Sequence, residues 1–404
     1  MTDLGRGADG AGAVEGGDRN TVLRVALDVS AVPERPVGAG HYIVQLAHQL
    51  SARSDVDLVL VSRAGDRARW DPLVPSGDLL AAAPDRRPVR LLWEQLRLGP
   101  LVTGSGATVH HGPHYTMPRR TAIPSVVTVH DLSFFEAPEW HERTKVVFFR
   151  HAITRAAREA AVIVCPSEVT ANALGRWCPV TAELVVAPHG VDTGRFRPEE
   201  PSTGADAARL AAIDPRLAGE RPLLVFVGTL EPRKDVPTLV GSFADIATRH
   251  PDALLVLAGG RGWGADAVDA AVEASGVGGR IVRTGYVPDE DIPALLRSST
   301  AVAYPSLYEG FGLPALEALA CGAPLVTTRG TAMEEVAGTS ALLVAPGDRA
   351  GLADALDALL AGTGDDRAAS ERRSLGFTIA DSHTWERSAD LHVGAYRIAA
   401  ATRG

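Results

Sequence analysis

The chain has 404 residues, of which 46% are hydrophobic and 22% are charged, and its formal net charge is -9. This length exceeds one compact domain, and the composition is typical of a globular enzyme rather than of a disordered or fibrous protein. The acidic balance argues against a nucleic-acid-binding protein, which needs clustered cations to meet phosphates, so no nucleic-acid partner is expected.

Residues 1–20 are rich in Gly, Ala and Asp and predict a disordered tail. They lack the basic-then-apolar order of a signal peptide, and no later apolar run is long enough to span a membrane, so we expect a cytoplasmic protein. The three cysteines form no C-x-x-C pair, which indicates neither a zinc site of that kind nor a disulfide framework.

From residue 21 to 197, short apolar runs alternate with amphipathic stretches, which predicts β-α units around a buried parallel sheet. The expected strands are 22–28, 56–62, 108–111, 125–130, 162–165 and 184–187, with helices over 41–52 and 142–160. Residues 198–221 are rich in Pro, Ala and Asp and predict a linker.

A second alternating series covers 222–382. The expected strands are 223–228, 254–258, 281–284, 301–304, 325–327 and 342–344, with helices over 236–249 and 313–320. The fold class is therefore α/β, with two Rossmann-like, doubly wound domains around an interdomain cleft. Ligands of such sheets bind beyond the carboxyl ends of the strands, so the loops that follow the strands are the candidates for chemistry.

The first of these loops contains Gly38 and Gly40, which allow backbone amides to approach a ligand at a helix N-terminus. The third glycine of G-x-G-x-x-G is missing, so this is not a dinucleotide-binding fingerprint. A tight strand-to-helix turn is the alternative interpretation.

Strand 125–130 ends in His130, followed by Asp131. Histidine exchanges protons near neutral pH, and aspartate can orient it or stabilise positive charge; a purely structural histidine is the alternative. Upstream, His110 and His111 point to opposite faces of a strand, so we do not expect them to share a metal ion.

In the second domain, Gly228 ends the first strand, and Arg233 and Lys234 precede the next helix. Two cations at a helix entrance suit a diphosphate, because their charge and the helix dipole act on the same anion. A solvated surface pair is the alternative.

The most informative segment is 305–324, where a glycine-rich loop follows a strand and opens a helix. Glu309 precedes this helix, and Glu317 lies within its apolar face, where an unpaired carboxylate is costly to bury. We therefore expect Glu317 to meet a ligand hydroxyl. The backbone amides expected to point at the same ligand belong to Gly310, Phe311, Gly312 and Leu313.

These motifs resemble family 4 of the retaining glycosyltransferases, which have the GT-B fold. The resemblance rests on E-G-F-G-L-P-A-L-E at 309–317, G-T-L-E-P-R-K-D at 228–235, G-A-G at 38–40, V-H-D-L at 129–132 and A-P-H-G-V-D at 187–192. It covers the chain from about residue 22 to the C-terminus. It implies an N-terminal acceptor domain over 21–197, a C-terminal nucleotide-sugar donor domain over 222–382, and a C-terminal helix, 383–404, that crosses back to the N-terminal domain.

The resemblance also implies roles. Glu317 would hold the ribose hydroxyls of the nucleotide, and Glu309 would bind hydroxyls of the transferred sugar. Arg233 and Lys234 would neutralise the leaving diphosphate in place of a metal, so neither a metal nor another cofactor is expected. The residues assigned to catalysis are His130, Asp131, Arg233, Lys234 and Glu309. Those assigned to the donor are Gly38, Gly40, Gly228, Arg233, Lys234, Glu309, Gly310, Phe311, Gly312, Leu313 and Glu317.

W-E-Q at 93–95 and H-G-P at 111–113 look most like bacterial mannosyltransferases of surface-polysaccharide assembly, which favours GDP-mannose as the donor. The expected acceptor is a glycan or a lipid-linked intermediate at the inner membrane surface. Residues 143–158 are one candidate for contact with that surface, with an ordinary packed helix as the alternative. The other functions considered are a transferase that uses UDP-glucose or another donor, a nucleotide-sugar epimerase of the same fold, and a non-catalytic sensor.

Overall fold

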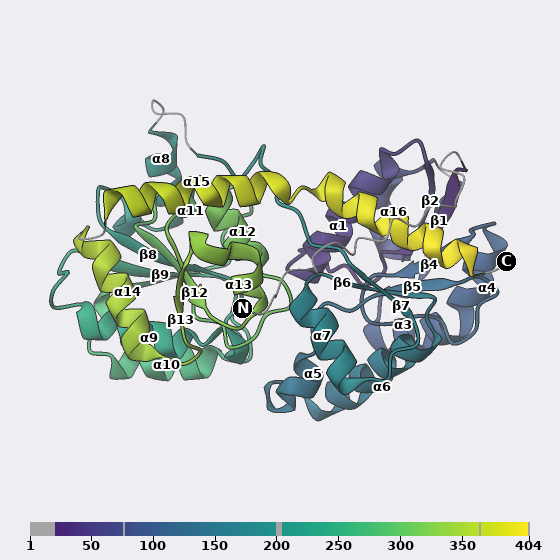
Figure 1. Ribbon diagram of the computed structural model, residues 1–404, viewed down its shortest axis with the longest axis horizontal. Helices are drawn as coiled ribbons and strands as arrows, with labels where there is room; N and C mark the ends of the chain where they lie inside the picture. The colour runs from purple at the N-terminus through teal and green to yellow at the C-terminus, as the bar shows by residue number, and fades with distance from the viewer. Residues whose placement is uncertain (1–20, 76, 199–203, 363–364, 403–404) are drawn as a thin grey trace, which may run out of the picture.

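The computed structural model describes residues 21–75, 77–198, 204–362 and 365–402. These residues form two domains that lie side by side, each built on one parallel sheet (Figure 1). The two doubly wound α/β sheets confirm the predicted fold class. The predicted tail, residues 1–20, lies outside the described residues.

The N-terminal sheet has the order β3-β2-β1-β4-β5-β6-β7, and its neighbouring strands pair in parallel. Its strands are β1 (Leu23–Asp28), β2 (Val56–Arg63), β3 (Leu79–Ala83), β4 (Val109–Gly112), β5 (Ser125–Thr128), β6 (Val162–Cys165) and β7 (Glu183–Val186). Strand β3 was not predicted from the sequence, because alanine, which makes up most of this strand, is depleted in strands generally.

The C-terminal sheet has the order β10-β9-β8-β11-β12-β13 and is also parallel. Its strands are β8 (Leu223–Val227), β9 (Leu254–Ala258), β10 (Ile281–Gly285), β11 (Ala301–Tyr304), β12 (Leu325–Thr328) and β13 (Leu342–Val344). Every residue of β9 and β11 is buried, as expected for strands covered by helices on both faces.

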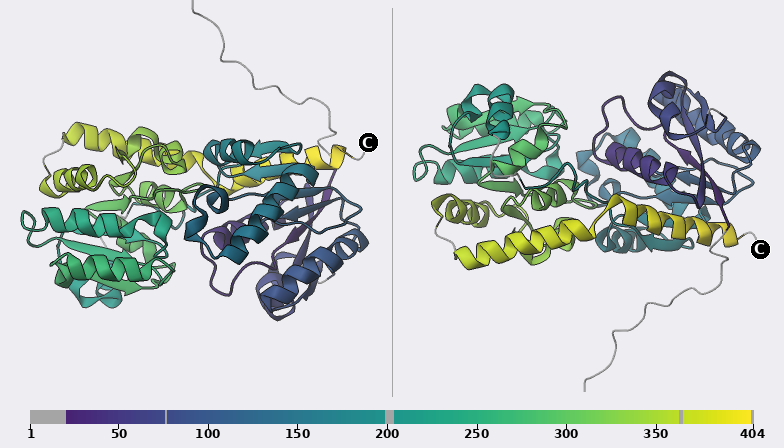
Figure 2. Two further views of the ribbon diagram at one scale, coloured as in Figure 1. Left: turned by 90° about the horizontal axis from the view of Figure 1, so that it is seen from below. Right: turned by 90° about the horizontal axis from the view of Figure 1, so that it is seen from above.

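Helices cover both sheets (Figure 2). The first domain carries α1 (Ala39–Ser51), α2 (Arg67–Trp70), α3 (Arg87–Trp93), α4 (Gly99–Gly104), α5 (Ser133–Glu136), α6 (Arg143–Glu159) and α7 (Glu168–Trp177). The second carries α8 (Ala205–Ile213), α9 (Val236–Ile246), α10 (Ala265–Ala274), α11 (Ile292–Arg297), α12 (Leu313–Ala320), α13 (Ala332–Ala337), α14 (Arg349–Ala361) and α15 (Asp366–Ser382). The last helix is α16 (Trp385–Ala401).

The segment predicted to be a linker, 198–221, contains helix α8. Leu210 of α8 and Leu217 after it are buried in the same core cluster as the strands of the C-terminal sheet. The described part of this segment therefore packs as part of the second domain. Its apolar residues are spaced too widely among Ala, Asp and Pro for the sequence pattern to indicate a core element.

Helices α15 and α16 run in succession across both domains (Figure 1, yellow). Helix α15 packs on α12 of the second domain, whereas α16 packs on α1 and on the strands of the first. Trp385, Val393 and Tyr396 of α16 belong to the N-terminal core. The chain thus returns to its first domain at its C-terminal end, and the two domains are joined by two crossings, after β7 and between α15 and α16.

Candidate active site

The two cations of the second domain lie in a short turn between β8 and α9. Residues Pro232–Lys234 form a 3-10 turn, and Asp235 then adopts a positive φ of 47° before α9 begins at Val236. Arg233 and Lys234 therefore lie in the 3-10 turn just before α9 and not in the first turn of that helix. The Lys234 side chain crosses Gly228, where an added Cβ would come within 3.4 Å of the lysine Nζ.

Glu309 lies against both cations. It is in the loop between β11 and α12, and its Oε1 accepts hydrogen bonds from Lys234 Nζ at 3.0 Å and from Ser306 Oγ at 3.2 Å. Its Oε2 accepts from a guanidinium nitrogen of Arg233. The structure thus brings together three of the predicted site residues, from the loops that follow two adjacent strands, β8 and β11.

A second carboxylate completes this charged cluster. Glu231 Oε2 accepts from Arg233 Nε at 2.7 Å. Burial disfavours the charge on Arg233, but Glu309 and Glu231 outweigh that effect and raise the pKa of the guanidinium. Burial likewise disfavours ionisation of Glu309, yet Arg233 and Lys234 hold its pKa at about 2. Arg233 and Glu309 are therefore both ionised throughout the physiological pH range.

The glycine-rich loop leads into α12. Gly312 has a φ of 112° and is the N-cap of the helix, which starts at Leu313. The Phe311 ring packs on His189 with 4.9 Å between centroids. Glu317 is partly buried on this helix and makes no hydrogen bond or ion pair within the described residues. Burial is the main cause that raises its pKa to about 7, with Arg195 acting in the opposite direction.

The N-terminal domain contributes His130 and Asp131 after β5. His130 is buried, and its Nε2 donates to the carbonyl oxygen of Pro113 at 2.8 Å, because a carbonyl can only accept. Burial lowers the pKa of His130, so the ring is neutral and its Nδ1 is left as an acceptor. Asp131 Oδ1 accepts from the Ser133 backbone amide and hydroxyl, and its charge helps to raise the Arg233 pKa across the domain boundary.

The two domains touch at this point. An added Cβ on Gly310 would lie 1.8 Å from the carbonyl oxygen of His130, so only glycine fits there. Ser167 Oγ donates to the Gly310 carbonyl oxygen at 2.7 Å, and the Leu132 backbone amide donates to the Tyr308 hydroxyl at 3.0 Å. His130 and Asp131 are thereby held beside the loop that carries Glu309.

The Gly38 and Gly40 loop lies at another part of the domain boundary. Gly38 has a φ of 49° and begins α1, and Gly40 is packed against Pro33 and Pro36. The adjacent His41 Nε2 lies 3.5 Å from Asp289 Oδ2 of the second domain. Asp289 is also close enough to affect the pKa of Glu317. The loop is therefore a neighbour of Glu317, and among the residues that the structure describes no hydrogen bond or ion pair joins it to Arg233 or Lys234.

The histidines of 110–114 are not arranged as a metal site. His110 Nδ1 contacts Ser125 Oγ at 3.2 Å, whereas His111 lies between the Tyr396 and Thr128 hydroxyls, each at 2.8 Å. Among the described residues, no group of three or more His, Cys, Asp or Glu side chains is placed to hold a metal ion.

Several residues of the site were missed by the sequence analysis. Ser306, Tyr308 and Glu231 adjoin predicted residues in the same loops, so the motifs themselves offered a signal for them. Arg195 and Asp289 lie far along the sequence from Glu317, and no local pattern indicates that their charges act on it.

The chain matches two family descriptions. Residues 36–195 match Glycosyltransferase Family 4, and residues 212–374 match Glycosyl transferases group 1. The chain is 30% identical over 295 residues to O-antigen chain mannosyltransferase B of Escherichia coli, covering 72% of this chain and 74% of that one. It is also 30% identical over 296 residues to a D-inositol 3-phosphate glycosyltransferase of Actinosynnema mirum, covering 69% and 67%.

A solved structure shows the same fold. Sucrose-phosphate synthase of Thermosynechococcus elongatus superposes with a TM-score of 0.73 at 22% sequence identity, over 93% of this chain and 98% of that one. Together with the two family matches and the two parallel domains, these similarities establish that the chain belongs to the family 4, group 1 glycosyltransferases of the GT-B fold.

Proposed function

We propose that this glycosyltransferase transfers mannose from GDP-mannose to a polysaccharide or lipid-linked acceptor, with retention of the anomeric configuration and without a metal ion. The observation that carries the proposal is the cluster of Arg233, Lys234 and Glu309 at the carboxyl ends of β8 and β11, in which Lys234 and Glu309 are buried and Arg233 is half-buried near Asp131. Fixed cations at this edge of a parallel sheet suit the diphosphate of a nucleotide sugar.

The chemistry follows from the placement of the charges. When the bond between the sugar C1 and the diphosphate breaks, negative charge grows on the leaving phosphate and positive charge on the sugar ring. Arg233 and Lys234 stabilise the first charge, and the Glu231 carboxylate holds the Arg233 guanidinium in place for it. The acceptor hydroxyl then bonds to C1 on the face that the phosphate leaves, and its proton passes to a phosphate oxygen.

The cations also support independence from metals. A divalent metal in other glycosyltransferases neutralises the leaving diphosphate, and the two cations Arg233 and Lys234 supply a comparable charge here. We therefore expect that chelators leave the turnover unchanged. Activity lost with EDTA and restored by manganese would contradict this part of the proposal.

The mannosyl donor is supported by the similarity to O-antigen chain mannosyltransferase B, together with the W-E-Q and H-G-P sequences of the first domain. A thermal-shift panel of GDP-mannose, UDP-glucose, dTDP-sugars and ADP-sugars tests it, since a bound ligand raises the melting temperature by mass action. The largest shift should come from GDP-mannose. A larger shift with UDP-glucose would overturn the assignment of GDP-mannose as the donor, but it would leave the proposed glycosyl transfer in place.

The transfer itself is tested by product analysis with and without an acceptor. Transfer requires the acceptor, whereas rapid isomerisation of the donor alone would indicate an epimerase. Lys234→Ala should lower turnover by about 10²-fold, the scale for losing one preorganised charge contact in a transition state. Lys145→Ala is the matched control, because Lys145 lies in the other domain and pairs with Glu142.

A further inference from the structure

We propose that a surface of the N-terminal domain, formed by α3, by the π-helical turn η3 (Glu94–Leu98) and by loop 117–121, docks on an anionic lipid bilayer. We call it the basic-apolar surface. Its members are Arg86, Arg87, Val89, Leu92, Leu96, Arg97, Arg119 and Arg120. The inference rests on the proposed function, because a lipid-linked acceptor would be presented at such a bilayer.

Three large apolar side chains form a row on this surface. Val89, Leu92 and Leu96 are 48%, 61% and 56% exposed, and they are spaced by three and four residues along the continuous helical segment from α3 into η3. That spacing places them on one face. Single exposed leucines are ordinary in soluble proteins, but an apolar row on a helix flanked by arginines is the pattern of a helix that lies in a membrane interface.

The charge on this surface is opposite to that of the chain as a whole. Residues 86–120 contain six arginines and one acidic residue, Glu94, whereas the whole chain has a net charge of -9. Glu94 is buried, and burial raises its pKa to about 8, so it adds little negative charge at neutral pH. The five arginines of the surface are exposed and make no ion pair or side-chain hydrogen bond with any residue that the structure describes.

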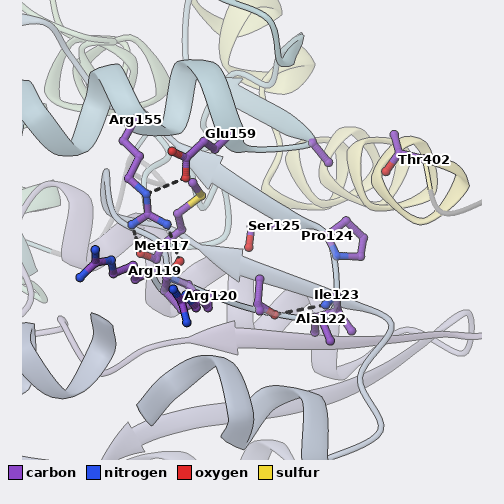
Figure 3. A pocket seen from close by; sticks show the side chains of 13 residues that line it. Met117, Arg119, Arg120, Ala122, Ile123, Pro124, Ser125, Arg155, Glu159 and Thr402 are labelled. Atoms are coloured by element: carbon purple, nitrogen blue, oxygen red, sulfur yellow. Dashed lines mark hydrogen bonds and ion pairs between the residues drawn. The ribbon is translucent and has the colours of Figure 1, made fainter. Parts of the chain in front are cut away.

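A cavity of about 540 Å³ adjoins the surface and is lined by residues 117–125 with Arg155, Glu159, Ala161 and Thr402 (Figure 3). Arg155 fixes its wall, because the guanidinium donates to the carbonyl oxygens of Met117 and Pro118 and to Glu159. Arg119 and Arg120 lie on the same wall and have no side-chain partner within the described part of the chain. A lipid phosphate entering here would meet these two cations.

The surface reaches the edge of the domain where the reaction is proposed. Gln95 Nε2 of η3 donates to the carbonyl oxygen of Met117, in the segment that follows β4, at 3.1 Å. In the same segment the His114 ring lies 6.0 Å, centroid to centroid, from the ring of His130. At its other end the surface reaches Arg119, whose backbone amide donates to the Gln95 carbonyl oxygen. An acceptor anchored in the bilayer could thus approach the site along this side.

Helix α6, the segment that the sequence analysis considered for membrane contact, fits less well. Its Val146 and Phe149 are buried, and Lys145 and Arg150 are engaged by Glu142 and by the Phe134 carbonyl oxygen. Of its large apolar side chains, only Val147 is mostly exposed. The ordinary packed-helix interpretation therefore describes most of α6.

The test is co-sedimentation of the full chain with vesicles, which needs neither donor nor turnover. We expect binding to phosphatidylglycerol vesicles at low salt and little binding to phosphatidylcholine vesicles. Binding should weaken in about 0.5 M salt, because ions screen the attraction. One basic residue near an anionic surface contributes roughly five-fold to partitioning, so Arg119→Ala with Arg120→Ala should weaken binding roughly 30-fold. Leu92→Ser should weaken it roughly ten-fold.

Matched controls lie outside the surface. Arg221→Ala with Arg387→Ala removes two exposed arginines elsewhere, and Leu375→Ser changes an exposed leucine of α15; both should bind as the wild type does. Absence of binding to anionic vesicles, or equal losses in the controls, would overturn the proposal. The proposal would also be overturned if the wild type formed a dimer that Leu92→Ser dissociates, because the surface would then be an interface between copies of the chain. Transfer to a water-soluble acceptor should be retained in the surface variants. If it is, a failure of the membrane proposal leaves the proposed transferase function intact.

Discussion

Glu309 accepts hydrogen bonds from Lys234 and Arg233 at once, so its carboxylate occupies the two cations proposed to bind a diphosphate. Replacing it with Gln keeps the shape and removes the competing charge. We expect Glu309→Gln to bind GDP more tightly, by roughly ten-fold, the scale of one hydrogen bond to a charged group. The unliganded protein should lose about 1.5–3 kcal/mol of stability, because buried cations lose their partner.

Calorimetric titration with GDP and thermal melting without ligand measure these two effects. Glu159→Gln is the control, because Glu159 is exposed and pairs only with Arg155. Weaker GDP binding by Glu309→Gln than by the wild type would mean that the carboxylate contacts the nucleotide directly.

Glu317 should make donor binding sensitive to pH if it belongs to the donor site as proposed. Because its pKa is raised to about 7, the carboxyl group is largely protonated at pH 6 and ionised at pH 8. If it holds ribose hydroxyls, the ionised form is the better acceptor, so donor affinity should rise between pH 6 and 8. The sign for stability is opposite: a raised carboxyl pKa means that the folded state binds the proton more strongly, so stability falls as pH rises from about 4.5 toward 7.

Donor titrations at pH 6 and pH 8 in the wild type and in Glu317→Gln check this prediction. The variant should bind the donor more weakly at pH 8, by roughly 1–3 kcal/mol for a lost charged hydrogen bond, and its affinity should vary less with pH. An unchanged nucleotide affinity at both pH values would show that Glu317 has a structural role.

Among the elements, α16 is joined to the N-terminal domain by a buried polar network. Tyr396 contacts His111 at 2.8 Å, and the Tyr42 hydroxyl contacts both His392, at 2.7 Å, and Thr128, at 2.9 Å. Burial lowers the pKa of each of these histidines, that of His392 to about 4. The network is therefore built from neutral rings that bind fewer protons than they would in the unfolded chain.

Acid should consequently loosen α16. The unfolded histidines take up protons once the pH falls below about 6.5, whereas the folded ones resist, so stability is lost as the pH falls from about 6.5 to 4. The melting temperature should drop steeply over this window. His392→Gln should flatten the drop, and His151→Gln, an exposed residue of α6, should leave it as it is. A melting temperature independent of pH over this range would refute the argument.

The elements that the sequence predicts well are those with a strong local pattern. Strands β8, β9 and β11 are continuous apolar runs, and the cluster around Glu309 follows from motifs in two loops. The pattern misses β3, whose alanines do not resemble a strand, and α8, whose apolar residues are sparse. It also misses the pairing of His111 with Tyr396, because residues 285 positions apart are brought together only by the fold of the whole chain.

In the molecule as a whole, the domains meet through contacts that come from several elements. The Glu335 carboxylate of α13 accepts from the backbone amides of Glu168 and Val169, at 2.8 and 2.9 Å, and so caps helix α7 of the other domain. Together with the Ser167–Gly310 bond and the His41–Asp289 pair, these contacts set the distance between the two sheets. The proposed transfer depends on that distance, because donor and acceptor would be bound by different domains.

Gly310→Ala tests this dependence directly. The new Cβ would overlap the carbonyl oxygen of His130, so the domains should separate at this contact while each keeps its own core. Since a misplacement of about 1 Å can cost about 10²-fold in rate, we expect turnover to fall by that order. Donor affinity should change little, because the cations lie within one domain, and small-angle scattering should show a larger radius of gyration. Gly394→Ala is the matched control, because an added Cβ there meets no atom within 4 Å. Wild-type turnover in Gly310→Ala would show that the contact between the domains does not govern the reaction.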